Sequence, residues 1–329
     1  MRTNDAIHLG LMLSAFAAAY LVPFELLLLA YVVLGPAHYF TEISWLHDRS
    51  YFLPHRGIAV VLAGLAIVAA LIDNASWFGF AMWGALIFCA MLAATQSAFE
   101  GMLLFMAAIA LSAIMYTSGS SLAVVGILIP TLIHVSLFTL VFMALGAWRA
   151  QSKAQAALVV VYLIAIAAIL LAPPTAEIRI AGFAQAAKDY FGNVGPALSR
   201  LFGIPGLKLD TRLTSLLAFV YTYHYLNWFI KADVIRWADI PRSRLALVAT
   251  ASAGSTALYF YDYAFGFTFL LALSLVHILL EFPLDSLALR QLGGALGSGL
   301  RSVIAGPAAT AAPLSRPANS KASKRTKPP

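Results

Sequence analysis

The chain has 329 residues, of which 61% are hydrophobic and 11% charged, and its mean hydropathy is +0.86. Soluble domains carry about 25% charged residues, so this composition predicts a membrane protein and leaves too little chain for a separate soluble catalytic domain. The net charge of +7 does not indicate nucleic-acid binding, because the basic residues lie between the apolar segments and near the C-terminus, where they determine membrane topology.

Apolar segments separated by short polar stretches predict an all-α fold, a polytopic bundle of about ten transmembrane helices. A spanning helix needs about 20 apolar residues. In chain order, the expected spans cover residues 6–22, 24–44, 57–73, 77–95, 98–116, 122–147, 156–172, 212–231, 244–261 and 264–284. Arg2 and a run of alanines give the first segment some features of a signal peptide, but we interpret it as a retained span because only Pro23 separates it from the second.

The basic residues are distributed unevenly between the two sides of the expected bundle. With ten spans and a cytoplasmic N-terminus, the inner connections carry Lys and Arg, for example Arg149, Lys231 and Arg244. The short outer connections, near Pro23 and Asp262, carry none. By the positive-inside rule, the sequence predicts a multi-pass protein of a bacterial-type inner (cytoplasmic) membrane, with both termini in the cytoplasm.

Two segments are expected to lie outside the membrane. Residues 173–211 have mixed polarity and predict a long outer loop with one amphipathic helix near residues 181–191. Residues 291–329 are basic and rich in Gly, Ala, Ser and Pro, which predicts a disordered cytoplasmic tail in contact with anionic lipid. The transmembrane domain accordingly covers residues 1–290.

Four of the seven histidines lie within expected spans, where an ionisable side chain marks a functional site. They are His38, His134, His224 and His277. Each follows the outer end of its span by roughly 12 to 14 residues, and at 1.5 Å per residue these offsets differ by only about 3 Å in depth. The sequence therefore predicts one layer of four imidazoles, slightly on the cytoplasmic side of the membrane midplane. The remaining histidines, His8, His47 and His55, are expected to face water or lipid headgroups.

Two of these histidines are followed four residues later by a glutamate, Glu42 after His38 and Glu281 after His277. Residues four apart share a helix face, and a carboxylate inside a membrane needs a partner. A metal ion, or the ring N–H of a metal-bound imidazole, is such a partner. Imidazole and oxygen ligands favour non-haem Fe(II), with zinc or manganese as alternatives. Cys89 is the single cysteine, which excludes a cysteine-ligated iron–sulfur cluster.

The candidate residues accordingly divide into two groups. The four intramembrane histidines are candidate metal ligands, and Glu42, Glu281 and Tyr223 are candidate catalytic groups, with Asp285 continuing the Glu281 face toward the inner surface. Other interpretations of the histidines are hydrogen bonds between helices, a haem held by two of the four, or a path for protons or ions. The chain has no HExxH motif, no histidine boxes of the membrane-desaturase kind and no nucleophile elbow.

The layout of the histidines resembles that of a known family. The shared features are an early Gly-Pro-x-His (Gly35, Pro36, His38), an aromatic-flanked histidine in a late helix (His224) and a histidine in the last helix (His277). In these features, and in its length, the chain resembles the Brp/Blh-type β-carotene 15,15′-dioxygenases. The resemblance implies an integral membrane enzyme that uses His-bound iron and O₂ to cleave β-carotene into retinal.

The chain departs from that family's pattern at two places. Tyr39 follows His38 where the family has glycine, and Asn227 and Trp228 stand where the family has further histidines. These departures bear on the substrate more than on the metal. We therefore expect an iron oxygenase that takes O₂ and a lipid-soluble small molecule from the bilayer into a closed pocket. The alternative is a proton- or cation-coupled transporter, which would have a water-filled path to both faces.

Overall fold

A computed structural model describes residues 3–72, 75–92, 98–117, 129–174 and 211–304. Every regular element in these ranges is a helix, which confirms the all-α prediction for them. The chain divides into two compact units, Met1–Leu292 and Gly293–Pro329, and the candidate site lies in the first. The α-helices are α1 (Thr3–Leu21), α2 (Pro23–Leu29), α3 (Gly35–Asp48), α4 (Arg56–Ala70), α5 (Ala75–Leu92), α6 (Ala98–Thr117), α8 (Thr139–Ala150), α9 (Lys153–Leu171), α12 (Thr211–Ile230), α13 (Ala232–Ile235), α14 (Arg242–Tyr261) and α15 (Tyr263–Ile304). Two segments are π-helical, η1 (Ala30–Leu34) and η3 (Ile129–Phe138), and η2 (Ser50–Phe52) is a 3₁₀ turn.

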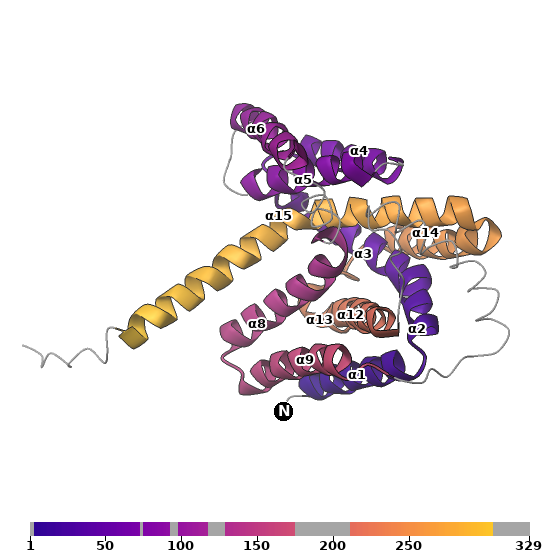
Figure 1. The fold of residues 1–329 in the computed structure, drawn as a ribbon, viewed down its shortest axis with the longest axis vertical. Coiled ribbons are helices and arrows are strands. Elements are labelled where there is room, and N and C mark those ends of the chain that lie inside the picture. The colour runs from indigo at the N-terminus through magenta and orange to yellow at the C-terminus, as the bar shows by residue number, and fades with distance from the viewer. Residues whose placement is uncertain (1–2, 73–74, 93–97, 118–128, 175–210, 305–329) are drawn as a thin grey trace, which may run out of the picture. The chain divides into compact units, whose positions relative to one another are not determined.

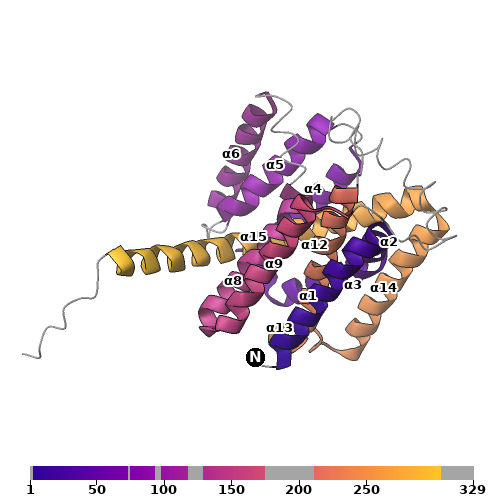
Figure 2. The same cartoon turned by 60° about the horizontal axis from the view of Figure 1, so that its bottom comes forward.

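Helix α12 is the central helix of the first unit. It packs against α1, α2, α3 and α9 and against both π-helical segments (Figure 1). Phe219 and Tyr223 of α12 share an apolar core with Met12 of α1 and Tyr162 of α9. Helices α1, α9 and α8 lie side by side, with α9 in contact with both α1 and α8, as Figure 2 shows. Because α12 is covered by protein on several sides, its polar residues are buried among other helices.

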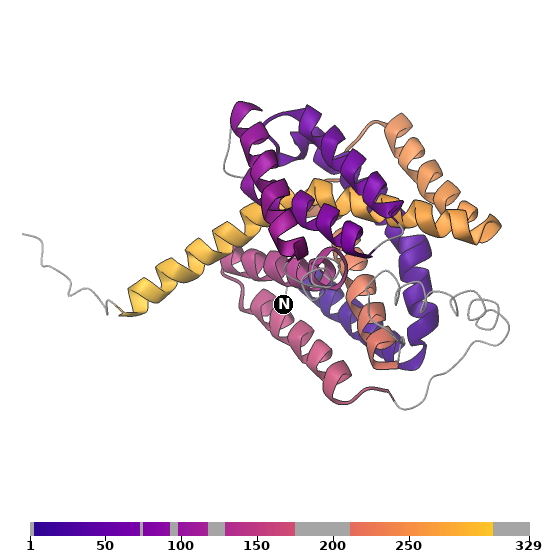
Figure 3. The ribbon, with the colours of Figure 1, turned by 45° about the horizontal axis from the view of Figure 1, so that its top comes forward.

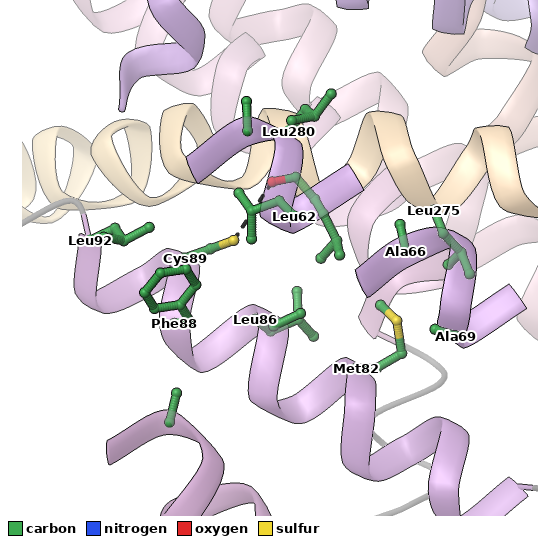
Figure 4. Packing of buried hydrophobic residues seen from close by; sticks show 14 of the residues in the cluster. Leu62, Ala66, Ala69, Met82, Leu86, Phe88, Cys89, Leu92, Leu275 and Leu280 are labelled. Carbon is green, nitrogen blue, oxygen red and sulfur yellow. Dashed lines mark hydrogen bonds between the residues drawn. The ribbon is translucent and has the colours of Figure 1, made fainter. Parts of the chain in front are cut away.

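A second apolar core joins α15 to the group formed by α4, α5 and α6 (Figure 3). Its buried residues include Met82 and Leu86 of α5, Leu62 of α4 and Leu275 of α15 (Figure 4). This core packs against the middle of α15, the part of the helix that carries His277 and Glu281.

Cys89 has a structural role in this second core. Pro283 lies inside α15 and has no N–H to donate to the carbonyl of Leu279, four residues earlier. The thiol of Cys89 donates to that carbonyl, with Sγ 3.6 Å from the oxygen (Figure 4). The single cysteine thus satisfies a backbone acceptor that the proline leaves free.

Replacing Cys89 by alanine is therefore expected to lower the free energy of unfolding by about 1–3 kcal/mol, the cost of an unsatisfied buried polar group. Cys89→Ser keeps a donor at the same place and is expected to lose less. Thermal unfolding of both variants in the same detergent measures the difference. Equal losses in the two variants would show that packing volume matters there and the hydrogen bond does not.

The prediction of ten spans is not supported. Among the described residues, three helical segments are long and apolar enough to cross a membrane: Pro23–Asp48, Lys153–Leu171 and Ala264–Gly297. Helix α4, with 15 residues, is shorter than a usual span. In α12 and α14, hydroxyl, amide and charged side chains lower the mean hydropathy. In α12 other helices cover polar residues such as Thr222 and Asn227, a packing that an apolar segment in the sequence does not show.

The C-terminal prediction needs a correction as well. Helix α15 continues to Ile304, whereas the sequence predicts a disordered tail from residue 291. Alanine and leucine are strong helix formers, and they continue the helix through the interspersed glycines of this stretch. Residues 305–329, the rest of the predicted tail, lie outside the described ranges, and so do residues 175–210 of the predicted outer loop with its amphipathic helix.

Candidate metal centre

Each of the four candidate metal-ligand histidines comes from a different helical segment of the first unit. His38 lies on α3, His134 on η3, His224 on α12 and His277 on α15. All four are buried. Two of these segments adjoin or contain a π-helix, since η1 runs directly into α3 and His134 lies within η3. π-helical turns are rare and frequently occur at functional sites.

Prolines next to the site are compensated by side chains from neighbouring helices. Pro36, two residues before His38, has no N–H for the carbonyl of Val32. Thr256 of α14 donates its hydroxyl to that carbonyl at 2.8 Å. This contact matches the one that Cys89 makes beside Pro283, so at both prolines a donor from another helix satisfies the carbonyl that the proline leaves free.

The four imidazole rings form a closed circle, in which each ring lies beside two others. The centroid of His38 is 4.9 Å from that of His224 and 5.4 Å from that of His277. The ring of His134 completes the circle at 5.6 Å from both His224 and His277. The structure therefore brings together all four histidines that the sequence places at one depth.

Hydrogen bonds on the far side of two rings leave their Nε2 atoms free for a metal. Nδ1 of His277 donates to the carbonyl of Ser274 at 2.6 Å, which fixes the tautomer with a lone pair on Nε2. Nδ1 of His224 lies 2.8 Å from Oγ1 of Thr139. In the described part of the chain, neither Nε2 atom has a hydrogen-bond partner. Metal-ligating histidines have this arrangement.

Two overlapping sets of ligand atoms lie close enough to hold one ion. Possible ligand atoms of His38, His224 and His277 lie within 4.8 Å of one another, and so do those of His134, His277 and Glu281. Because Nδ1 of His277 is engaged by Ser274, its Nε2 is the atom common to both sets. An imidazole nitrogen binds one metal, so the geometry fits a single ion beside His277.

Three carboxylates surround the histidines and are as deeply buried. Oε2 of Glu42 lies 2.9 Å from Nε2 of His38. Oε2 of Glu281 lies 3.3 Å from Nε2 of His134, and Oδ2 of Asp285 lies 3.4 Å from Nδ1 of the same ring. Within the described ranges, no Lys or Arg forms an ion pair with any of the three. Uncompensated buried carboxylates are costly, and a divalent cation at the histidines would balance them.

The structure separates Tyr223 from the other predicted catalytic groups. Its ring packs against Tyr162 and Phe219, in the core between α1, α9 and α12. Two other tyrosines adjoin the histidines instead. Tyr39 stacks on the ring of His277 with centroids 4.2 Å apart, and its hydroxyl lies 2.6 Å from that of Tyr225.

Searches of protein-family models, of curated proteins and of solved structures find no match to this chain. The chemistry of the site therefore has to be inferred from its own residues.

A cavity of about 670 Å³ extends from the candidate metal centre. That volume is within the range of small-molecule pockets, about 300–1,000 Å³. Its inner end is formed by His38, His224, Glu42 and Glu281. On α3, α12 and α15 every lining residue coincides with or follows the histidine of that helix, and the lining residues of α8 follow His134 of η3. Along these segments the cavity therefore extends from the histidines toward the C-terminal end of each helix.

Thr139 contributes to the centre and was missed in the sequence analysis. It follows His134 by five residues, outside the helical spacing that the analysis considered, and its importance arises from contact with His224 on another helix. A buried threonine at the start of α8, within an otherwise apolar stretch, is the signal that the sequence offers.

Replacing Thr139 by valine is expected to weaken metal binding by about 10- to 100-fold, the usual effect of removing a hydrogen-bond partner of a ligating histidine. The two side chains have nearly the same volume, so the packing changes little. Thr268→Val is the matched control, because the Thr268 hydroxyl is exposed and bonds only to the carbonyl of Ala264 in its own helix. Metal titration of both variants measures the effect, and equal affinities would contradict the role of Thr139.

Proposed function

We propose that this protein is an integral membrane non-haem iron oxygenase that acts on a lipid-soluble substrate. The observation that carries the proposal is the ring of four buried histidines at the end of a ligand-sized cavity, with free Nε2 atoms on His224 and His277 and three buried carboxylates around the ring. Three segments long and apolar enough to cross a membrane support insertion in the bilayer, and the distribution of Lys and Arg supports cytoplasmic termini in an inner membrane.

The donor set favours iron among the metals that imidazole binds. Three or four neutral imidazoles with one or two carboxylates suit Fe(II), and positions that the protein does not fill are what O₂ chemistry requires. When bound, Fe(II) would supply the activation of O₂. Zinc and manganese are the alternatives for the same donors.

The residues of the chain would divide the remaining work. His38, His224 and His277 hold the metal, with His134 or Glu281 as a further ligand. Asp285 lies where its carboxylate can accept a hydrogen bond from the Nδ1–H group of His134. That bond would hold the tautomer in which the Nε2 lone pair can bind the metal. Glu42 orients His38 across 2.9 Å. Apolar lining residues such as Phe142 and Leu145 keep bulk water from the substrate.

The resemblance of the sequence to the Brp/Blh-type enzymes suggests one reaction, the oxidative cleavage of a carotenoid to a retinal-type aldehyde. Iron-loaded protein in lipid nanodiscs, supplied with β-carotene, is therefore expected to consume O₂ and to form an aldehyde detectable by mass spectrometry. His277→Ala should abolish both signals, because His277 belongs to both candidate ligand sets. His47→Ala should change neither, because His47 is half exposed at the end of α3. Equal O₂ uptake by both variants would contradict the proposal.

The alternative, a proton- or cation-coupled transporter, would use the same His and Glu side chains. It requires a water path from the histidine layer to both faces, whereas the cavity residues of α3, α12 and α15 all coincide with or follow the histidine of their helix. Ion flux into liposomes that depends on Glu281 and not on iron would favour the transporter.

A further inference from the structure

The cavity has three chemically different zones along its length. The inner end is polar and consists of the histidines and carboxylates of the metal centre. Along α8, α12 and α15, the lining residues that follow the inner end are mainly apolar or aromatic, Phe142, Leu145, Trp228 and Leu284, with the amide of Asn227 among them. The outer end is polar and includes two cationic side chains.

The outer end opens where several helices end on the same side. Asn4 near the start of α1, and Arg149 and Ala150 at the end of α8, line the cavity and are exposed. Lys231, in the turn between α12 and α13, lines the same end. Arg149 and Lys231 are among the basic residues that the positive-inside rule assigns to the cytoplasmic side, an assignment that puts this opening at the inner membrane surface.

Lys231 has no acidic partner in the described ranges, neither by hydrogen bond nor by ion pair. It is partly buried, and the burial lowers its pKa to about 8, because desolvation disfavours the ammonium form. Arg149 bonds to the side-chain oxygen of Gln291 and to no carboxylate among the described residues. Asp5 also lines this end, is buried and has an interaction of its own. An anion at the opening would therefore meet two cations and one carboxylate.

The order of the zones matches the order of groups in an amphiphile. We propose that the cavity binds a single-chain amphiphile with an anionic head group, a carboxylate or a phosphate, at Lys231 and Arg149, and with its apolar chain directed toward His224 and Glu281. Lys231 follows His224 by seven residues, about 10 Å along the helix axis. When the head group of the amphiphile lies at Lys231, the segment of its alkyl chain several bonds from the head group would thus lie at the metal centre. This inference rests on the proposed function only where it identifies that segment of the alkyl chain as the site of oxidation.

The test compares three probes that share one chain and differ in head group: oleate, oleyl phosphate and oleyl alcohol. Radiolabelled probes are titrated against the full-length protein in nanodiscs of neutral phosphatidylcholine, with empty nanodiscs as the blank. We expect saturable binding of oleate, of oleyl phosphate or of both, at least about tenfold tighter than that of oleyl alcohol, as a charge-assisted hydrogen bond provides. Whichever anion binds more tightly identifies the head group.

Lys231→Gln is expected to remove most of that tenfold preference, and Arg149→Gln, at an exposed position, to reduce it without affecting folding. Arg56→Gln is the matched control, because Arg56 is exposed at the start of α4 and does not line the cavity. Equal binding of oleate, oleyl phosphate and oleyl alcohol by the wild-type protein would overturn the inference. So would a preference for the anions that survives both substitutions in the cavity.

The titrations are carried out on both iron-free and iron-loaded protein, which separates this inference from the proposed function. A preference for the anionic probes in protein that takes up no iron supports the binding site and overturns the oxygenase. Stoichiometric iron together with equal affinity for the three probes supports the oxygenase and overturns the anionic substrate.

Discussion

His277→Asn is expected to lower the affinity for iron(II) at least about 100-fold. Removing a residue that only hydrogen-bonds to a ligating histidine lowers metal affinity less, by about 10- to 100-fold. Nε2 of His277 is the atom common to both candidate ligand sets, so no arrangement of the remaining residues keeps a full set. The asparagine occupies part of the same space beside Tyr39, which limits the loss of packing. Anaerobic titration with Fe(II) in detergent measures the affinity.

The control for this variant is His47→Asn, which makes the same change at an exposed position. We expect it to bind iron as tightly as the wild-type protein. If His277→Asn matched that control, the ring of histidines would be a set of buried side chains without a metal, and the polar core would need another explanation.

Glu281→Gln is expected to change thermal stability in opposite directions with and without metal. Without iron, Glu42, Glu281 and Asp285 are three buried acids without a Lys or Arg partner among the described residues, and neutralising one relieves their repulsion. With iron, the same substitution removes a compensating charge or a ligand. We expect the melting temperature of the iron-free protein to rise and that of the iron-loaded protein to fall. Each kcal/mol of change in the free energy of unfolding shifts the melting temperature by about 2–4 °C.

Differential scanning fluorimetry of iron-loaded and chelator-treated protein measures both changes. Glu100→Gln is a suitable control, because Glu100 is exposed at the start of α6 and should shift both forms alike. A fall of the same size in both forms for Glu281→Gln would mean that Glu281 acts only through its contact with His134 and that no cation balances it.

Helical periodicity and depth were enough to predict part of this centre. The four histidines could be found because each interrupts an apolar segment at a similar distance from its end. Spacing also predicted the contact of Glu42 with His38, since residues four apart share a helix face. These are properties of single helices, and a sequence contains them.

The contacts that could not be predicted are those between helices. Glu281 shares a face with His277, yet its carboxylate lies against His134 of η3, because that segment packs beside α15 at this level. Tyr223 is next to His224 in the chain, but adjacent residues of a helix point in different directions, so its ring joins the core around Tyr162.

The prediction of ten spans is not supported, for a related reason. Hydropathy alone does not distinguish a helix that faces lipid from one covered by its neighbours. In α12, polar residues such as Asn227 and Thr222 are buried by the surrounding helices, so a helix of moderate hydropathy occupies the centre of the bundle.

The central claim is that one metal ion is held by the ring of histidines. Elemental analysis of the full-length protein, purified in detergent after production in iron-sufficient medium, tests it most directly. We predict one iron per chain in the wild-type protein and none in the His38→Ala/His277→Ala variant. No stoichiometric metal in the wild-type protein, after reconstitution with iron, zinc and manganese in turn, would contradict the account.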